Sequence, residues 1–240
     1  MARLFLKSKQ KWMYRSATIL LSPSEIPAAE LSARIDLILE RELSPLGFER
    51  IRPRLWVESK HPPIRRLFEF QPIARAVYSA RWGFSLDFVP IQRAQKLAWK
   101  RTAKTARFDL SIDPIDSEGR PREWFSVRRF AYPAKEYDWA SFGRAVNDTA
   151  TGARPDFNRV NSIEDIVAIF RERSTMKFKR FYLENYIQTH IAWGLSLIAI
   201  GEPDEGERHL LDYCARFSID RNDPILRQAE QAATALAEKR

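Results

Sequence analysis

The sequence predicts an α+β fold: an amino-terminal helix packed on an antiparallel β-meander of four to five strands, followed by an α-helical carboxyl-terminal region. Three observations predict it. Apolar residues recur at helical spacing before Pro45 and Gly47, then alternate with polar residues in short runs up to residue 130, and return to helical spacing beyond residue 137. Strands joined by short turns without crossover helices favour antiparallel pairing.

Residues 23–46 are predicted to form the first helix. Ser24 can cap it, Pro27 lies in its first turn, and Pro45 with Gly47 ends it. The apolar residues of its buried face are Leu31, Ile35, Ile38 and Leu39. Because the preceding residues 1–22 are basic and carry no clear pattern, we expect an amino-terminal arm there.

The alternating runs predict the strands. The first covers residues 50–57 as one strand, and the others lie at residues 68–71, 81–88, 107–112 and 124–130. His61, Pro62 and Pro63 mark the turn after the first strand. Pro72 is expected to end the second strand, because proline cannot donate a hydrogen bond to a strand ladder.

A basic insert separates the third and fourth strands. Residues 92–107 contain no acidic side chain, and their basic residues recur at intervals of three and four, which predicts a short helix with one charged stripe. Like charges on one stripe repel each other, so the stripe needs solvent, ions or an anionic partner. The acidic carboxyl-terminal region could also neutralise it: residues 181–240 carry 6 basic and 10 acidic side chains, whereas residues 1–110 carry 21 and 10.

The last part of the chain is predicted to be helical. Helices are expected at residues 137–147, at residues 163–173 with Ser162 and Asp165 as a capping box, at residues 176–200, and after Pro203 and Pro224. Residues 151–161, with Gly152 and Pro155, are the expected linker. The predicted organisation is therefore a sheet domain over residues 23–150, with the helical insert 92–107, and a helical region over residues 161–240.

Two resemblances to known families accompany this pattern. Residues 43–48 read L-S-P-L-G-F and are followed by Trp56, by F-E-F-Q at residues 68–71 and by W-G-F at residues 82–84. Over roughly residues 30–130 the chain resembles a bacterial family known only as a domain of unknown function, which implies the helix-to-sheet fold and no catalytic residue. Residues 199–206, followed by Leu210 and Ala215, resemble the turn and second helix of a tetratricopeptide-type hairpin.

Composition and motifs narrow the function classes. Hydrophobic residues make up 45% of the 240 residues and charged residues 30%, which is typical of a folded globular protein. The single cysteine, the absence of a secretory pattern and the absence of about 18 consecutive apolar residues favour a cytoplasmic protein without membrane association. No Cys/His spacing indicates a metal site, and no cofactor is expected.

The sequence gives little support to an enzyme. It has no Gly-rich phosphate loop, no G-x-S-x-G and no H-E-x-x-H, and only three histidines. Cys214 lies five residues from His209 and therefore off its helical face, so His209 and Asp212 have no third metal ligand on their helix. Cys214 is expected to be a buried thiol. His190 is expected to be a core or interface histidine. The strand carboxylates that could instead form salt bridges or a paired acid site are Glu58, Glu69, Asp87 and Asp109. An enzyme of unrecognised type stays an alternative.

The basic residues carry the main functional hypothesis. Arginines at every second position from residue 50 share one face of the predicted first strand, with a tryptophan continuing the row as a stacking surface. The candidate partner-binding residues are Arg50, Arg52, Arg54, Trp56, Arg93, Lys96, Lys100, Arg101, Lys104 and Arg107.

These residues predict a non-enzymatic binding protein that recognises an anionic partner. An acidic protein is the first candidate, as an immunity or antitoxin-type inhibitor would bind, because no helix-turn-helix, zinc-finger or RNP signature is present. Tyr182, Tyr186 and Trp193 are the candidate interface anchors for such a partner. Nucleic acid bound through the basic stripe is the alternative. The sequence predicts no oligomeric state.

Overall fold

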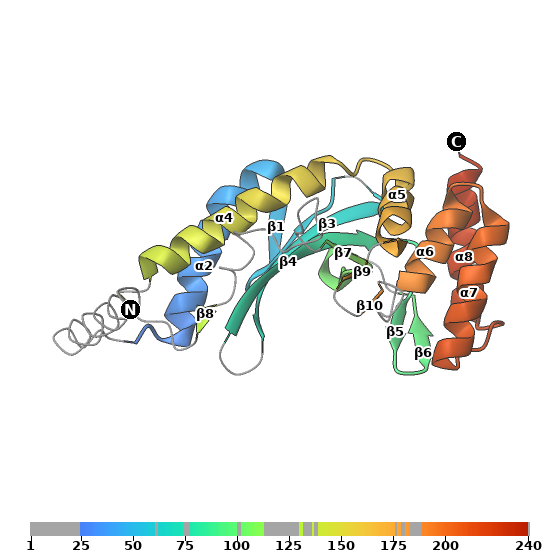
Figure 1. The fold of residues 1–240 in the computed structure, drawn as a ribbon, viewed down its shortest axis with the longest axis horizontal. Coiled ribbons are helices and arrows are strands. Elements are labelled where there is room, and N and C mark those ends of the chain that lie inside the picture. Colours follow the sequence, from blue (N-terminus) through green and yellow to red (C-terminus); the bar gives the residue numbers. More distant parts are fainter. Residues whose placement is uncertain are drawn as a thin grey trace, which may run out of the picture.

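The computed structural model describes residues 25–60, 62–73, 77–99, 102–112, 130–131, 136, 139–175, 177–178, 181–182 and 189–239. An amino-terminal helix, an antiparallel sheet and carboxyl-terminal helices follow one another, which confirms the predicted α+β class (Figure 1). The predicted arm at residues 1–22 and the cap Ser24 lie outside the described residues, as does all of the predicted fifth strand except Phe130.

The main sheet has the strand order β1-β2-β3-β4-β7, and β8 also pairs with β4. Its strands are β1 (Phe48–Arg52), β2 (Leu55–Glu58), β3 (Ile64–Ile73), β4 (Val77–Leu86), β7 (Leu110–Ile112) and β8 (Phe130–Ala131). The small elements are the pairs β5 (Ile91–Arg93) with β6 (Lys96–Ala98) and β9 (Lys177–Phe178) with β10 (Phe181–Tyr182), and the 3₁₀ turns η1 (Ser44–Leu46) and η3 (Ala103–Thr105). The helices are α2 (Ala28–Leu43), α4 (Trp139–Asn158), α5 (Ile163–Ser174), α6 (Thr189–Ala199), α7 (Pro203–Phe217) and α8 (Pro224–Ala237).

The first helix, α2, begins later than predicted, with Pro27 at its N-cap instead of inside its first turn. It ends through η1 at Gly47, whose φ of 86° lies in the left-handed region that glycine adopts without a steric cost. Its apolar stripe is buried as expected, with Leu31, Ile35 and Leu39 fully inaccessible to solvent. The chain therefore passes from α2 through η1 and Gly47 directly into β1.

The prediction of one strand over residues 50–57 is wrong, because the chain reverses at Pro53 and Arg54. Arg54 adopts a left-handed φ of 63°, and its backbone N–H donates to the carboxylate of Asp36 on α2 at 3.0 Å. The reversal makes β1 and β2 an antiparallel hairpin in which Arg50 lies opposite Trp56. The helix thus fixes the turn of the hairpin.

The two long strands β3 and β4 form the centre of the sheet. They pair antiparallel from Ile64 opposite Leu86 to Ile73 opposite Val77. Pro72 pairs with Tyr78 within β3 and does not end the strand. Trp82 and Phe68 are cross-strand partners with stacked rings 6.1 Å apart.

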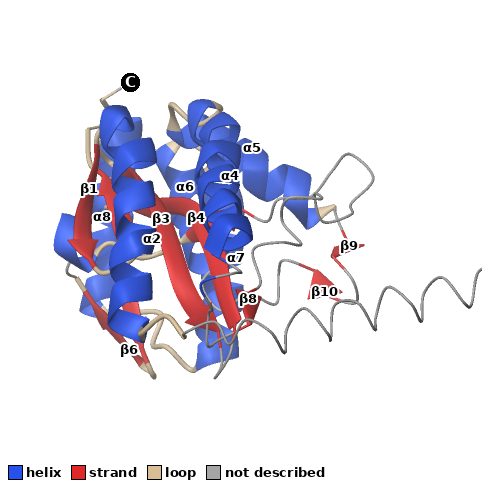
Figure 2. Ribbon diagram, turned by 90° about the vertical axis from the view of Figure 1, so that its left-hand side faces the viewer, coloured by secondary structure: helices blue, strands red, loops and turns tan. Residues whose placement is uncertain are grey.

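Helices α2 and α4 pack against one another and cover one face of the sheet, as the turned view shows (Figure 2). The aromatic core between helices and sheet includes Trp56, Phe68, Phe70, Trp82, Phe84, Phe142 and Phe157, all at most 2% exposed. Burying each of these side chains stabilises the fold by roughly 1.5–3 kcal/mol. Alternation predicts the buried positions of Phe68, Phe70, Trp82 and Phe84, whereas Trp56 was predicted to continue the exposed arginine row and Phe157 to lie in the linker.

The predicted linker at residues 151–161 is wrong, because most of it belongs to α4. Ala153 and Phe157 are buried within this segment, and Pro155 lies exposed near the helix end. Burial of one helix face here outweighs the cost of a proline in the last turns. A single apolar cluster consequently runs through the described chain from Ile26 to Ala233.

The helices at the carboxyl end agree with the sequence except at the start of α6. The capping box of Ser162 and Asp165 begins α5, and prolines begin α7 and α8, as predicted. The prediction of a helix over residues 176–200 is wrong at residues 177–178 and 181–182, which form β9 and β10, and aromatic residues such as Phe178 and Phe181 are common in strands. Residues 183–188 lie outside the described part of the chain. Helices α6, α7 and α8 stand together at one end of the molecule, beside β5 and β6 (Figure 1).

The predicted basic helix over residues 92–107 is wrong. The described residues there form β5, β6 and η3. Ile91 and Leu97 are buried, and the hairpin between them turns at Ala94, which has a left-handed φ of 52°. Contacts with the core therefore decide the local structure of the insert.

Within the described ranges, no helix combines the length and the apolar character needed to cross a lipid bilayer.

Candidate anion-binding surface

The structure separates the arginines that were predicted to share one strand face. Arg50 lies on the helix side of the sheet, where its guanidinium donates to Asp36 at 3.0 Å. Trp56, opposite Arg50, is only 2% exposed. An indole this buried cannot stack on a nucleotide base, so the predicted row of arginines ending in a stacking surface does not exist.

Arg52 lies on the other side of the sheet, in a charged row whose members come from β1, β3 and β4. The carboxylate of Glu69 on β3 lies 3.6 Å from the Arg52 guanidinium and 3.7 Å from that of Arg81 on β4. Both contacts are longer than a hydrogen bond. Two arginines therefore flank one carboxylate, and the row keeps an excess of positive charge.

Arg81 was not among the predicted partner-binding residues. Its guanidinium lies over the ring of Phe108 at 3.8 Å from the centroid, and its side chain is 41% exposed. Desolvation lowers the pKa of Arg81; Glu69 opposes this shift, while repulsion from Arg52 and Arg107 adds to it. Arginine stays charged despite such shifts, and stacking fixes the plane in which it can donate to a carboxylate.

Arg107 connects this row to the insert. Its backbone N–H donates to the Ser85 hydroxyl on β4 at 3.4 Å, and its guanidinium donates to the carbonyl oxygen of Gln92 on β5 at 3.5 Å. Around it, Ala103, Ala106 and Phe108 pack with Leu55, Val57 and Leu67 on the second face of the sheet. The insert thus covers part of the face that carries the charged row.

The cations at the surface of the insert are Arg93, Lys96 and Lys104, hereafter the insert cations. Arg93 and Lys96 pair across the tip of the hairpin, and Lys104 lies in η3. All three side chains are exposed, and no ion pair joins any of them to a carboxylate of the described chain. Lys100 and Arg101 lie outside the described residues.

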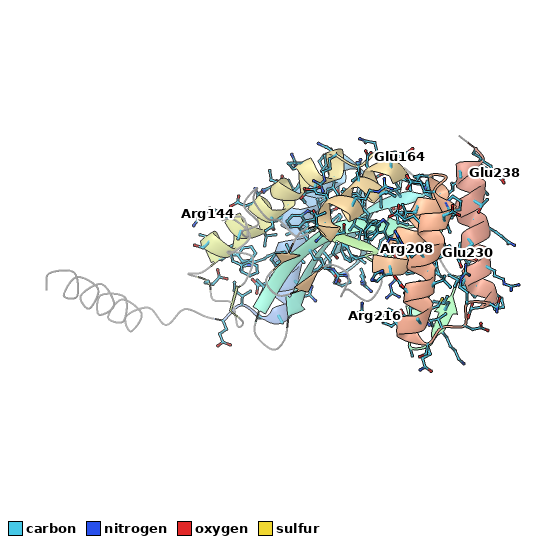
Figure 3. All side chains as sticks on the ribbon, turned by 45° about the vertical axis from the view of Figure 1, so that its right-hand side comes forward. Arg144, Glu164, Arg208, Arg216, Glu230 and Glu238 are labelled. Atoms are coloured by element: carbon cyan, nitrogen blue, oxygen red, sulfur yellow. The ribbon has the colours of Figure 1, made fainter. Side chains whose placement is uncertain are left out.

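The acidic helical region does not neutralise the insert cations through the described residues. Four of its carboxylates engage arginines of their own region: Glu202 and Glu205 contact Arg171, and Glu207 and Glu230 contact Arg221. Side chains of both signs, such as Arg208 of α7 and Glu230 of α8, lie on neighbouring helices of this region (Figure 3). The contact between this region and the β5–β6 hairpin is instead neutral. The Tyr213 hydroxyl donates to the side-chain oxygen of Gln92 at 2.7 Å, and burial raises the pKa of Tyr213 well above its usual range.

The predicted strand carboxylates do not meet in a paired acid site. Glu69 belongs to the charged row described above, and Asp87 forms two short hydrogen bonds with Arg65, at 2.6 and 2.8 Å. Glu58 accepts from the backbone N–H of Lys60, and Asp109 from that of Leu86. Each of the four carboxylates therefore has a separate structural partner.

Among the predicted interface anchors, the side chains of Tyr182 and Tyr186 lie outside what the structure describes. Trp193 is 6% exposed and stacks on Phe170 at 5.7 Å and on His209 at 4.2 Å. It is a core residue of the helical region and presents little surface to a partner.

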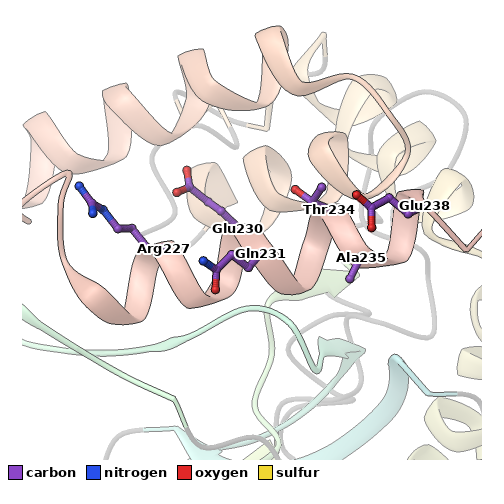
Figure 4. Close-up of a pocket in the computed structure, with 6 residues that line it drawn as sticks. All are labelled: Arg227, Glu230, Gln231, Thr234, Ala235 and Glu238. Carbon is purple, nitrogen blue, oxygen red and sulfur yellow. The ribbon is translucent and has the colours of Figure 1, made fainter.

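Two further features of the helical region bear on a site. Cys214 is buried, and burial raises the pKa of its thiol. An open hollow of about 420 Å³ runs along α8 (Figure 4). Its described lining residues are Arg227, Glu230, Gln231, Thr234, Ala235 and the C-cap Glu238, so all of them come from this one helix and its end.

Comparisons of the chain with protein-family models, with curated proteins and with solved structures find no match. A function can therefore be inferred only from the charged surface described above.

Proposed function

We propose that the chain is a non-enzymatic cytoplasmic binding protein that recognises an acidic protein, as an immunity or antitoxin-type inhibitor does. One observation carries the proposal: the insert cations Arg93, Lys96 and Lys104 are exposed and have no carboxylate partner in the described chain. Three unmatched cations so close in sequence create a local positive potential. Such a potential speeds the encounter with an acidic surface and selects against basic ones.

The charged row adds a more specific contact. Arg81 is held flat on Phe108, and Arg52 lies on the opposite side of the same carboxylate. A second carboxylate, supplied by a partner, can accept paired hydrogen bonds from a guanidinium with a fixed plane. Arg107 lies close enough to Arg81 to repel it, and its guanidinium donates to the carbonyl oxygen of Gln92, the residue before Arg93 in β5, which supports including both groups of cations in the proposal.

An acidic protein fits this surface better than nucleic acid does. Binding of single-stranded nucleic acid usually combines cations with exposed aromatic rings, and the tryptophan predicted for that role, Trp56, is buried. Duplex recognition would need an element that enters a groove, and the described residues around the insert cations form a hairpin and a short turn. Binding of nucleic acid is therefore the alternative result that the following experiment can reveal.

The test compares two triple variants with equal loss of charge. One removes the insert cations (Arg93→Ala, Lys96→Ala, Lys104→Ala), and the control removes exposed cations elsewhere (Arg144→Ala, Arg208→Ala, Lys239→Ala). Binding of polyglutamate and of duplex DNA is measured at two salt concentrations. At about 0.5 kcal/mol for each exposed contact, the first variant should bind polyglutamate roughly 10-fold more weakly. The control should resemble the unchanged protein.

The native partner provides the second readout. Copurification should recover one acidic protein in stoichiometric amount with the unchanged chain and with the control, but not with the insert variant. Equal binding of polyglutamate by both variants would contradict the proposal. In the alternative outcome, the unchanged chain and the control bind duplex DNA tightly and with a steep salt dependence, while the insert variant does not. That result would identify nucleic acid, and not an acidic protein, as the partner of this surface.

A further inference from the structure

Two histidines from neighbouring helices face each other in the helical region. His190 lies in the first turn of α6 and His209 in the middle of α7. Their Nδ1 atoms are 3.4 Å apart, and their ring centroids 5.7 Å apart. The two ring nitrogens therefore point at one another, and both rings are partly exposed to solvent.

Packing holds these rings in place. Helices α6 and α7 form a hairpin whose backbones approach closely: a Cβ atom on Gly194 would lie 2.8 Å from the carbonyl oxygen of Gly206. The ring of His209 stacks on Trp193 at 4.2 Å, and Trp193 is itself buried against Phe170. The position of His209 is thus set by the core of the helical region.

The electrostatic surroundings keep a lone pair available. Burial is the main factor that lowers the pKa of His209, and repulsion from His190 and Arg208 adds to it, while Glu205 and Asp212 oppose it. His209 is therefore neutral near pH 7. One neutral ring can donate its Nδ1 proton to the other, or both rings can carry their proton on Nε2 and direct two lone pairs into the space between them.

The spacing of the two nitrogens is that of two ligands on one metal ion. Imidazole nitrogens bind Zn²⁺ at about 2.0–2.1 Å, and two of them at a tetrahedral angle lie roughly 3.3–3.4 Å apart. The observed separation of 3.4 Å matches this value.

We propose that His190 and His209 form a two-histidine site for a divalent late first-row transition metal, with Zn²⁺ as the expected ion. Imidazole nitrogen suits Zn²⁺, Ni²⁺ and Cu²⁺ and discriminates against Mg²⁺ and Ca²⁺. The described residues contain no group of three or more metal-ligating side chains, so water fills the other coordination positions. A site of this kind exchanges its ion more readily than a four-ligand structural site.

Coordination changes the state of the pair in a defined way. In the hydrogen-bonded state, the ring that donates must change tautomer, losing its Nδ1 proton to water and taking one up on Nε2. Both Nδ1 lone pairs then bind the ion, and each neutral ring carries its one proton on Nε2. The ion joins α6 to α7 and should raise the melting temperature of the chain in proportion to its occupancy.

The first experiment titrates the full-length, metal-free chain with Zn²⁺ by isothermal calorimetry. We expect one equivalent to bind, and His190→Ala and His209→Ala to weaken binding by at least ~10-fold each. The matched control is His61→Ala, which removes the third histidine of the chain and should bind as before. Mg²⁺ should give no heat of binding. Equal binding by all three variants, or no saturation by Zn²⁺, would overturn the proposal.

A second measurement needs no variant and so does not depend on how the substitutions fold. In the unchanged chain labelled with ¹⁵N-histidine, Zn²⁺ should shift the Nδ1 resonances of two of the three histidines and leave the third where it was. A shift of one histidine only, or of none, would show that the two rings do not share an ion. Quenching of Trp193 fluorescence by Cu²⁺, lost in His209→Ala, gives an independent optical readout.

Discussion

The indole N–H of Trp82 on β4 donates a 2.9 Å hydrogen bond to the carboxylate of Asp156 on α4. Trp82 is fully buried and Asp156 only 6% exposed, so neither group can exchange this partner for water. A hydrogen bond inside an apolar core fixes the position of α4 relative to the sheet. It also lies in the segment that the sequence presented as a linker.

Removal of this carboxylate should destabilise the fold. Asp156→Ala leaves the Trp82 N–H buried without an acceptor, and we expect the free energy of unfolding to fall by about 1–3 kcal/mol. Asp156→Asn keeps an oxygen acceptor and should cost less. Asp148→Ala, at an exposed position of the same helix, is the control. Urea unfolding followed by circular dichroism measures all three. Equal stability of Asp156→Ala and Asp148→Ala would refute the role of the bond.

Asp36 should matter more for the first hairpin than either arginine that it contacts. Its carboxylate accepts from the Arg54 backbone N–H and from the Arg50 guanidinium, both at 3.0 Å. Asp36→Ala removes both contacts and should cost about 1–3 kcal/mol. Arg50→Ala removes a half-exposed ion pair and should cost under about 1 kcal/mol. Chemical denaturation ranks the two variants, and the opposite order would contradict this account.

The close approach of α6 and α7 predicts contrasting effects of alanine at glycine positions. A Cβ on Gly206 would lie 2.7 Å from the carbonyl oxygen of Gly194, so Gly206→Ala must push the helices apart, at a cost of roughly 1–3 kcal/mol. Gly143 in α4 meets no atom closer than 3.7 Å, and Gly143→Ala should stabilise the chain by up to about 1 kcal/mol. Thermal melts of the two variants should shift in opposite directions.

Stability should fall in mild acid because of His209. Its pKa is lower in the folded chain than the value of about 6.5 expected when unfolded, so the unfolded chain takes up the proton first. This contribution is complete above pH 6.5 and is lost as the pH falls from there through the folded pKa. His209→Gln should flatten the pH dependence of the urea midpoint between pH 8 and 5, measured with a chelator present. His61→Gln should leave the slope unchanged.

Much of the fold could be predicted because local signals and tertiary packing agree. The capping box at Ser162 starts α5, and Pro203 and Pro224 start α7 and α8, where the sequence places them. The alternation through Trp82, Phe84 and Leu86 gives β4 with its buried side. At these points the pattern is strong enough that no distant contact is needed to choose the structure.

The errors lie where a local pattern fits two structures equally well. The alternation of the sequence continues through the turn at Pro53 and Arg54, so the hairpin reads like one strand, and Arg54 is not the glycine or asparagine that usually marks such a reversal. A shift of the pairing register between Arg50 and Arg52 then places these two arginines on opposite faces of the sheet, which the alternation does not show. Residues 92–107 have cations at helical spacing, but burial of Leu97 and the bond from Tyr213 to Gln92 favour a hairpin. That bond joins residues 121 positions apart, which no local window contains.

The sequence predicts only part of the candidate site, because the rest depends on contacts between residues far apart in the chain. The sequence identified the insert cations, but Arg81 was not among the predicted partner-binding residues. Its stacking on Phe108 depends on how the insert folds back over the sheet, which the sequence does not show. Similarly, the sequence does not indicate that His190 and His209 lie together, because only the packing of α6 on α7 brings their Nδ1 atoms to 3.4 Å.

The continuous apolar cluster from Ile26 to Ala233 also constrains how the chain can be divided. Since α4 spans the boundary that a linker would have provided, we expect the sheet and the carboxyl-terminal helices to unfold in one cooperative transition. A fragment that stops near residue 160 would expose apolar side chains that now pack in this cluster, and we expect it to aggregate. Single substitutions should therefore be tolerated at exposed positions such as the insert cations, whereas the buried residues of the sheet, the insert and the helices must stay compatible with one another.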